Sequence, residues 1–194
     1  MQEIKTRFQK RKESTHRAVM NTALTLIEEK GSDTVSMDLI AETADISRAT
    51  LFNHFHTKGE LLVEVFTPLF DDSLRIIQET LADIRSSTLD PLEGIQRVCL
   101  YLWETKRIIM ISEKNGKSIY DCDKLISLHT AMVSSFELLF EELSKTCTLR
   151  MPDYTQSARL IYKTFIPVLE VLGSSADRDS IFSGCLKGLL IDDC

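Results

Sequence analysis

Apolar residues recur along this chain every three or four positions, the spacing of one face of an α-helix. The first such stretch runs from about Arg11 to Lys30, and Gly31 is placed to end it. β-branched alternation, which marks strands, is absent over any useful length. The pattern therefore predicts an all-α fold.

Two short helices joined by a tight turn are predicted within residues 36–55. Ser36 and Ser47 can each cap a helix, because a serine hydroxyl accepts from the free N–H groups of a first turn. Leu51 and Phe55 are four residues apart and are expected to face inward. The outer face then carries hydrogen-bonding side chains: Arg48, Thr50, Asn53 and His54. This arrangement is typical of a helix-turn-helix that reads the DNA major groove.

Helix-start signals divide the rest of the chain. Thr57 and Glu60 have the spacing of a capping box, and a helix should run from there to about Arg85, kinked or broken at Pro68. Asp90-Pro91 should begin another helix that reaches about Met110. Three further helices are expected at about 119–147, 152–173 and 177–191.

Composition is that of an ordinary globular protein, with 43% apolar and 27% charged residues among 194. No apolar run approaches the roughly 18 residues of a membrane span, and the basic N-terminus lacks the apolar segment of a signal peptide. The five cysteines are far apart and form no C-x-x-C pair. This usage favours a cytoplasmic protein without a zinc site or a disulfide framework, and we expect no cofactor or metal.

The net charge of −6 is unevenly distributed. Residues 1–17 hold six basic and two acidic side chains, whereas residues 59–194 hold 14 basic and 21 acidic ones. A basic N-terminal run is often only a solvated tail. Beside a helix-turn-helix, we interpret it as a phosphate-facing segment, because affinity for DNA depends on local basic charge.

One stretch resembles the TetR family of bacterial regulators. The resemblance covers residues 10–65 and is carried by Ile40-Ala41-x-x-Ala44-x-Ile46-Ser47-x-x-Thr50-Leu51-Phe52-x-His54-Phe55-x-x-Lys58-x-x-Leu61-Leu62. Asp45 stands where the family usually has a turn glycine, and Phe52 where it usually has tyrosine. Aspartate tolerates left-handed backbone better than most residues, so the turn should survive.

The resemblance implies two domains: residues 1–57 for DNA binding, and residues 58–194 for ligand binding and dimerisation. Arg48, Thr50 and Asn53 would face base edges or nearby phosphates. Ser36, His54 and Lys58 would contact phosphate, and Ser47 is counted with these DNA-binding residues. The implied partner is double-stranded DNA with a palindromic operator, and no membrane.

The C-terminal two-thirds should hold a ligand pocket if the resemblance extends to it. Polar and bulky apolar residues that could line such a pocket are Trp103, Tyr120, His129, Met132, Phe136 and Phe140. For any one of these residues, a place in the core is the simpler interpretation. The last two helices should form a homodimer contact, because the final one is apolar over a wide arc and has Gly184 and Gly188 four residues apart.

The sequence favours a regulator over an enzyme. The four histidines are scattered, and the chain has no G-x-S-x-G, no H-E-x-x-H and no phosphate-cradling glycine loop. The expected function is that of a repressor released from its operator by a small apolar ligand. The alternative is a helix-turn-helix regulator that works through a protein partner or without a ligand.

Overall fold

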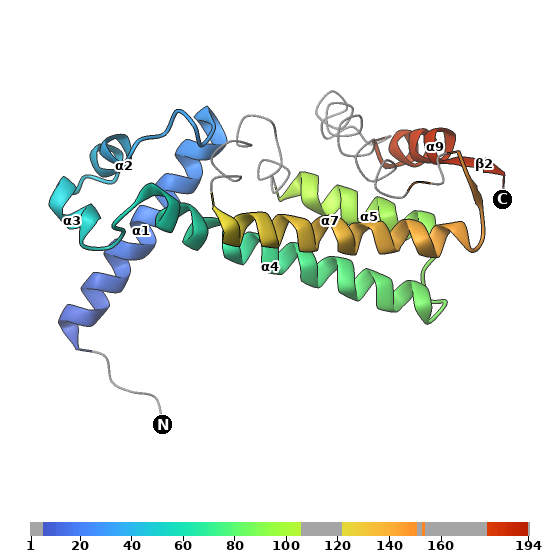
Figure 1. Ribbon diagram of the computed structural model, residues 1–194, viewed down its shortest axis with the longest axis horizontal. Helices are drawn as coiled ribbons and strands as arrows, with labels where there is room; N and C mark the ends of the chain where they lie inside the picture. The colour runs from blue at the N-terminus through green and yellow to red at the C-terminus, as the bar shows by residue number, and fades with distance from the viewer. Residues whose placement is uncertain (1–5, 106–121, 151–152, 154–177, 194) are drawn as a thin grey trace. The chain divides into compact units, whose positions relative to one another are not determined.

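The computed structural model describes residues 6–105, 122–150, 153 and 178–193 (Figure 1). Its helices are α1 (Arg7–Lys30), α2 (Met37–Thr43), α3 (Arg48–Phe52), α4 (Lys58–Arg85), α5 (Pro91–Glu104), α7 (Asp123–Ser144) and α9 (Arg178–Leu190). The predicted all-α class is confirmed, and the helix expected at 152–173 lies outside the described residues. Among the residues described, no helix combines the length and apolar character needed to cross a membrane.

Two compact units divide the chain within α4. The N-terminal unit contains the described residues up to Leu69 and the first turn of α7, through Ile126. The C-terminal unit contains the remaining described residues from Phe70 onward. The domain boundary expected at residue 57 stays a prediction.

The N-terminal unit is built on α1, against which α2 packs, and α3 packs on α2. Helix α1 begins four residues earlier than its apolar stripe suggests, because Thr6 and Gln9 form a reciprocal capping box. It ends as predicted at Gly31, whose φ of 81° is costly for residues with a Cβ. The core of this unit is apolar: Val19, Ala23, Leu26, Ile27, Ile40, Ala41, Leu51, Phe55, Leu61, Leu62, Val65 and Phe66.

Helix α4 runs from Lys58 to Arg85 without ending at Pro68. The hydroxyl of Thr57 accepts from the N–H of Glu60 at 3.1 Å, as the capping-box spacing predicts. The Glu60 carboxylate accepts from the N–H of His56 instead of that of Thr57, so the reciprocal half of the box is shifted by one residue. Beside the proline, the Thr67 hydroxyl donates to the Val63 carbonyl at 2.6 Å.

In the C-terminal unit, α5 packs closely on α4 at Gly94. A Cβ built at Gly94 would lie 2.6 Å from Cδ1 of Ile84 and 3.1 Å from Cγ2 of Thr80, so a larger residue would force these side chains apart. Helix α5 begins at Asp90-Pro91 as predicted, but it ends at Glu104 instead of near Met110.

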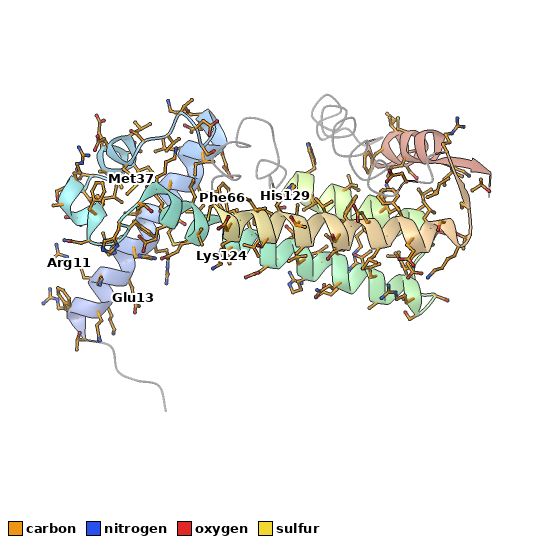
Figure 2. All side chains as sticks on the ribbon, viewed as in Figure 1. Arg11, Glu13, Met37, Phe66, Lys124 and His129 are labelled. Carbon is orange, nitrogen blue, oxygen red and sulfur yellow. The ribbon has the colours of Figure 1, made fainter. Side chains whose placement is uncertain are left out.

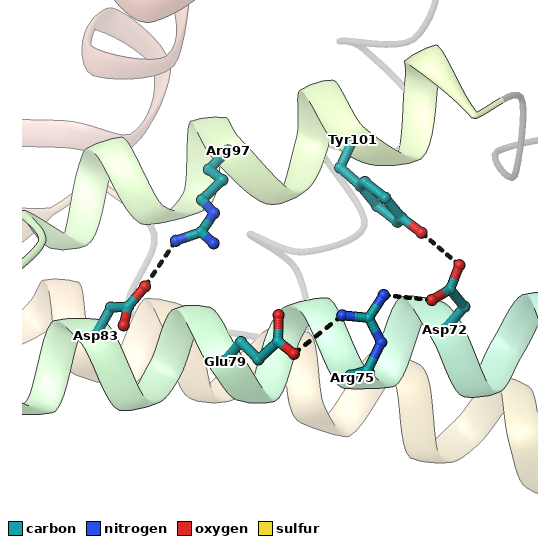
Figure 3. Close-up of polar contacts among 6 residues, drawn as sticks. All are labelled: Asp72, Arg75, Glu79, Asp83, Arg97 and Tyr101. Carbon is teal, nitrogen blue, oxygen red and sulfur yellow. Dashed lines mark hydrogen bonds and ion pairs between the residues drawn. The ribbon is translucent and has the colours of Figure 1, made fainter.

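Polar side chains also connect α4 and α5 (Figure 3). The Tyr101 hydroxyl donates to Asp72 at 2.7 Å, and Arg97 donates to Asp83 at 2.7 Å. Arg75 bridges Asp72 and Glu79 along α4 at 2.5 and 2.9 Å. Exposed ion pairs each add little free energy, so burial of the apolar side chains between the helices contributes most of the stability.

A short antiparallel ladder joins β1 (Thr148–Leu149) to β2 (Ile191–Asp193), and Arg150 Nε donates to the Ile191 carbonyl at 3.1 Å. The sequence pattern did not predict these strands, and Ile191 belongs to β2 instead of the last helix. Cys147 is disulfide-bonded, whereas Cys99, Cys122 and Cys185 are free.

Candidate nucleic-acid interface

The turn between α2 and α3 is closed by backbone hydrogen bonds and capped on both sides. Ser36 accepts from the N–H of Leu39 at 3.1 Å, and Ser47 accepts from the N–H of Thr50 at 3.0 Å. Within the turn, the N–H of Ile46 reaches the Ala41 carbonyl at 3.0 Å. Asp45 has a φ of 52°, the left-handed geometry that the sequence predicts at this position.

Leu51 and Phe55 are completely buried, which leaves the opposite face of α3 in solvent. Arg48 and Asn53 are exposed, and Thr50 and His54 are half-buried. Helix α3 is shorter than expected: Asn53 is its C-cap, and His54 follows it. The predicted base-facing side chains therefore lie at both ends of a five-residue helix.

Several of the predicted contact residues already have partners within the protein. The Ser47 hydroxyl caps α3 and also lies 2.8 Å from the Thr50 hydroxyl. Lys58 Nζ donates to the Ser32 carbonyl at 2.5 Å, in the loop after α1. Partial burial lowers the pKa of Lys58, and the nearby Asp33 carboxylate opposes this shift.

A cluster that the sequence did not predict joins α1, the end of the helix-turn-helix and α4. The His16 ring stacks on Phe55 with 4.6 Å between ring centres, and its Nε2 lies 2.8 Å from a Glu64 carboxylate oxygen. The His54 ring centre is 5.5 Å from that of His16. Partial burial lowers the pKa of His54, and positive charge on His16 and Lys12 lowers it further.

The start of α1 is exposed and mostly basic, and Figure 2 labels Arg11 as one of its basic residues. Its exposed basic side chains are Arg7, Lys10, Arg11, Lys12 and Arg17. Phe8 is 77% exposed among them. The predicted basic N-terminal segment is thus helical from Arg7 onward.

The candidate ligand residues that the structure describes belong to the C-terminal unit, where several of them form its core. Met132, Phe136 and Phe140 of α7 are buried, and the last two rings meet edge to face at 5.7 Å. Trp103 is half-buried on α5, and His129, which is labelled in Figure 2, is half-buried on α7. Burial lowers the pKa of His129. Tyr120 lies outside the described residues.

The final helix, α9, has one buried face and one open face. Phe182 and Leu186, four residues apart, are fully buried. Ile181 is 43% exposed, and a Cβ built at Gly184 or Gly188 would meet no atom of the described chain within 4 Å. Cys185 completes this open face at helical spacing.

Among the described residues, no group of three or more His, Cys, Asp or Glu side chains could hold a metal ion. The capped helix pair and its open face instead define a helix-turn-helix domain. The family model described as bacterial regulatory proteins, tetR family, matches residues 19–65. Over these residues, which hold the helix-turn-helix, the chain is similar to this family of regulators.

Sequence similarity to a curated relative is confined to about a third of the chain. The uncharacterized HTH-type transcriptional regulator YdeS of Bacillus subtilis (strain 168) is 36% identical over 66 residues. That match spans 34% of this chain and 33% of the relative.

Solved structures extend the likeness in fold to nearly the whole chain. A TetR-family transcriptional regulator from Agrobacterium tumefaciens has a TM-score of 0.63 and 13% identity, covering 92% of this chain and 99% of that one. The TetR-family regulator PfmR from Thermus thermophilus has a TM-score of 0.62 and 17% identity, covering 95% of each chain.

Proposed function

We propose that this chain is a DNA-binding repressor that acts in the cytoplasm as a homodimer and is released from a palindromic operator by a small apolar ligand. The observation that carries the DNA-binding part is the open face of α3. Arg48 and Asn53 are exposed there, while Leu51 and Phe55 anchor the segment in the core. An arginine can bind guanine and an asparagine adenine, each through two hydrogen bonds.

Alanine substitution at Asn53 tests base recognition. Asn53→Ala should weaken operator binding by about 1–3 kcal/mol and relax selectivity at one base position, because the adenine would lose its bidentate partner. Lys58→Ala should instead weaken binding to all sequences alike and flatten the dependence on salt. Gel shifts over a salt series measure both effects, and wild-type binding by both variants would contradict the assignment.

Affinity for DNA is expected to rise as the pH falls from about 8 to about 6. The pKa of His54 is lowered in the free protein, so its imidazole is neutral at the upper end of this range. A neighbouring phosphate would favour the protonated form, so binding would take up a proton. His54→Gln should flatten the pH dependence measured by fluorescence anisotropy at constant salt.

His56→Gln is the matched control for this titration, because His56 is exposed and pairs with Glu60 within 3.4 Å. It should retain the wild-type pH dependence. An unchanged dependence in His54→Gln would remove His54 from the phosphate contacts.

Ligand release would depend on α4, which begins beside the helix-turn-helix and continues into the C-terminal unit. A ligand among Trp103, His129, Met132, Phe136 and Phe140, with Tyr120 as a further candidate, would favour an arrangement that shifts α4. Two recognition helices on a fixed operator tolerate little change in their separation. A coupling of about 1–3 kcal/mol would give roughly 5- to 150-fold release.

A thermal-shift screen with fatty acids of increasing chain length and planar aromatic compounds tests this proposal. A ligand at about 100 times its Kd should raise Tm by roughly 5–10 °C. The same compound should then weaken DNA binding in gel shifts. Stabilisation without loss of DNA affinity would contradict coupling. If no compound binds, the result favours the alternative, a regulator that works through a protein partner or without a ligand.

A further inference from the structure

Arg48, the first residue of α3, is held from two sides within the helix-turn-helix. Its Nε lies 3.2 Å from Oδ1 of Asp38 in the first turn of α2. Its Cζ lies 5.5 Å from the centre of the Phe52 ring, at the end of α3. These contacts set the position of the guanidinium relative to both short helices.

The ion pair between Arg48 and Asp38 adds little to the stability of the fold. The side chains of Arg48 and Asp38 are 69% and 63% exposed, and ion pairs in solvent contribute little to the free energy of unfolding. The contact does restrict a long, flexible side chain before any partner arrives. Such preorganisation reduces the entropy that the side chain loses on binding.

The atom that Asp38 engages matters for base recognition. The ion pair occupies Nε, which lies on the side of the guanidinium fork. The terminal Nη1 and Nη2 groups can then reach the O6 and N7 acceptors of one guanine together. The carboxylate itself repels the phosphates of any sequence, so it lowers general affinity while it orients the arginine.

We propose that Asp38 is a positioning residue for base recognition: it orients Arg48 so that Arg48 discriminates guanine at one position of each operator half-site. This inference rests on the proposed DNA-binding function. It gives Asp38 two opposite effects, a gain in selectivity at one base pair and a loss of affinity for DNA in general.

The test compares Asp38→Asn with Glu42→Gln. Glu42 is an exposed acid on the same helix, so the control removes an equal charge without removing the ion pair to Arg48. The wild type first selects its preferred duplex from a random library. Affinities are then measured for that duplex, for all its single-base variants and for unselected DNA, with Tm recorded for each protein.

Asp38→Asn should lose about fivefold or more of its discrimination at one position of each half-site, and binding to unselected DNA should strengthen. Glu42→Gln should strengthen binding to unselected DNA while keeping every base preference. Arg48→Ala should lose discrimination at the same position as Asp38→Asn. In the Arg48→Ala background, Asp38→Asn should have no further effect on base preference.

Equal base preferences in Asp38→Asn and Glu42→Gln would overturn the inference. So would a loss at a position where Arg48→Ala has no effect. If the wild type enriched no sequence from the library, the proposed function itself would fail, a result distinct from a selective wild type that is indifferent to Asp38.

Discussion

Replacing Phe140 with alanine is expected to lower the free energy of unfolding by about 3–5 kcal/mol, among the largest effects of any single truncation. The Phe140 side chain is completely buried on α7, and its ring meets that of Phe136 edge to face at 5.7 Å. Truncation would remove this contact and leave a cavity. Urea denaturation followed by the fluorescence of Trp103, the single tryptophan of the chain, measures the loss.

Leu138→Ala is the matched control, because Leu138 lies on the same helix and is 38% exposed. Its cost should be about 1 kcal/mol or less. A cost for Phe140→Ala no larger than that of the control would show that the ring is not packed as core. That outcome would strengthen the interpretation of Phe140 as a wall of a ligand pocket.

Replacing Ile181 with glutamate is expected to abolish dimerisation, and operator binding with it. Ile181, Gly184, Cys185 and Gly188 follow the spacing i, i+3, i+4, i+7 and share the open face of α9. A charge in a packed interface costs several kcal/mol unless it finds a partner. A helix-turn-helix dimer gains affinity because its two copies bind both half-sites of the operator. A monomer should therefore lose most of its operator binding.

Analytical ultracentrifugation at micromolar concentration measures this effect, with Lys187→Glu as the control on the polar side of α9. Lys187 is exposed and lies about 120° around the helix from Ile181, so its variant should remain dimeric. Leu186→Glu is a poor test, because Leu186 is buried within the chain and its replacement would disturb folding. A monomeric wild type would remove the dimer from the proposed function.

Helical periodicity and capping patterns predicted most of the described fold. The starts of α4 and α5 follow from Thr57 and from Asp90-Pro91. The early start of α1 was also predictable, because Thr6 and Gln9 have the spacing of a capping box. The prediction followed the apolar stripe instead and began the helix too late. Strands of two and three residues are too short to show alternation, so β1 and β2 could not be predicted this way.

Only part of the candidate interface could be predicted from the sequence. Burial of Leu51 and Phe55 follows from spacing, and the outward face of α3 follows from their burial. The contacts of Arg48 with Asp38, of Lys58 with Ser32 and of His16 with Glu64 join different elements. Such pairs depend on how the helices pack, which local patterns do not specify.

Pro68 is expected to mark a boundary for local unfolding within α4. Proline has no N–H, so the backbone ladder of the helix lacks one bond there, and the compact units divide close by, between Leu69 and Phe70. Local unfolding that starts in one unit can stop at this missing hydrogen bond instead of spreading along the whole helix. A single helix thus passes through two regions whose local openings are free to differ in free energy.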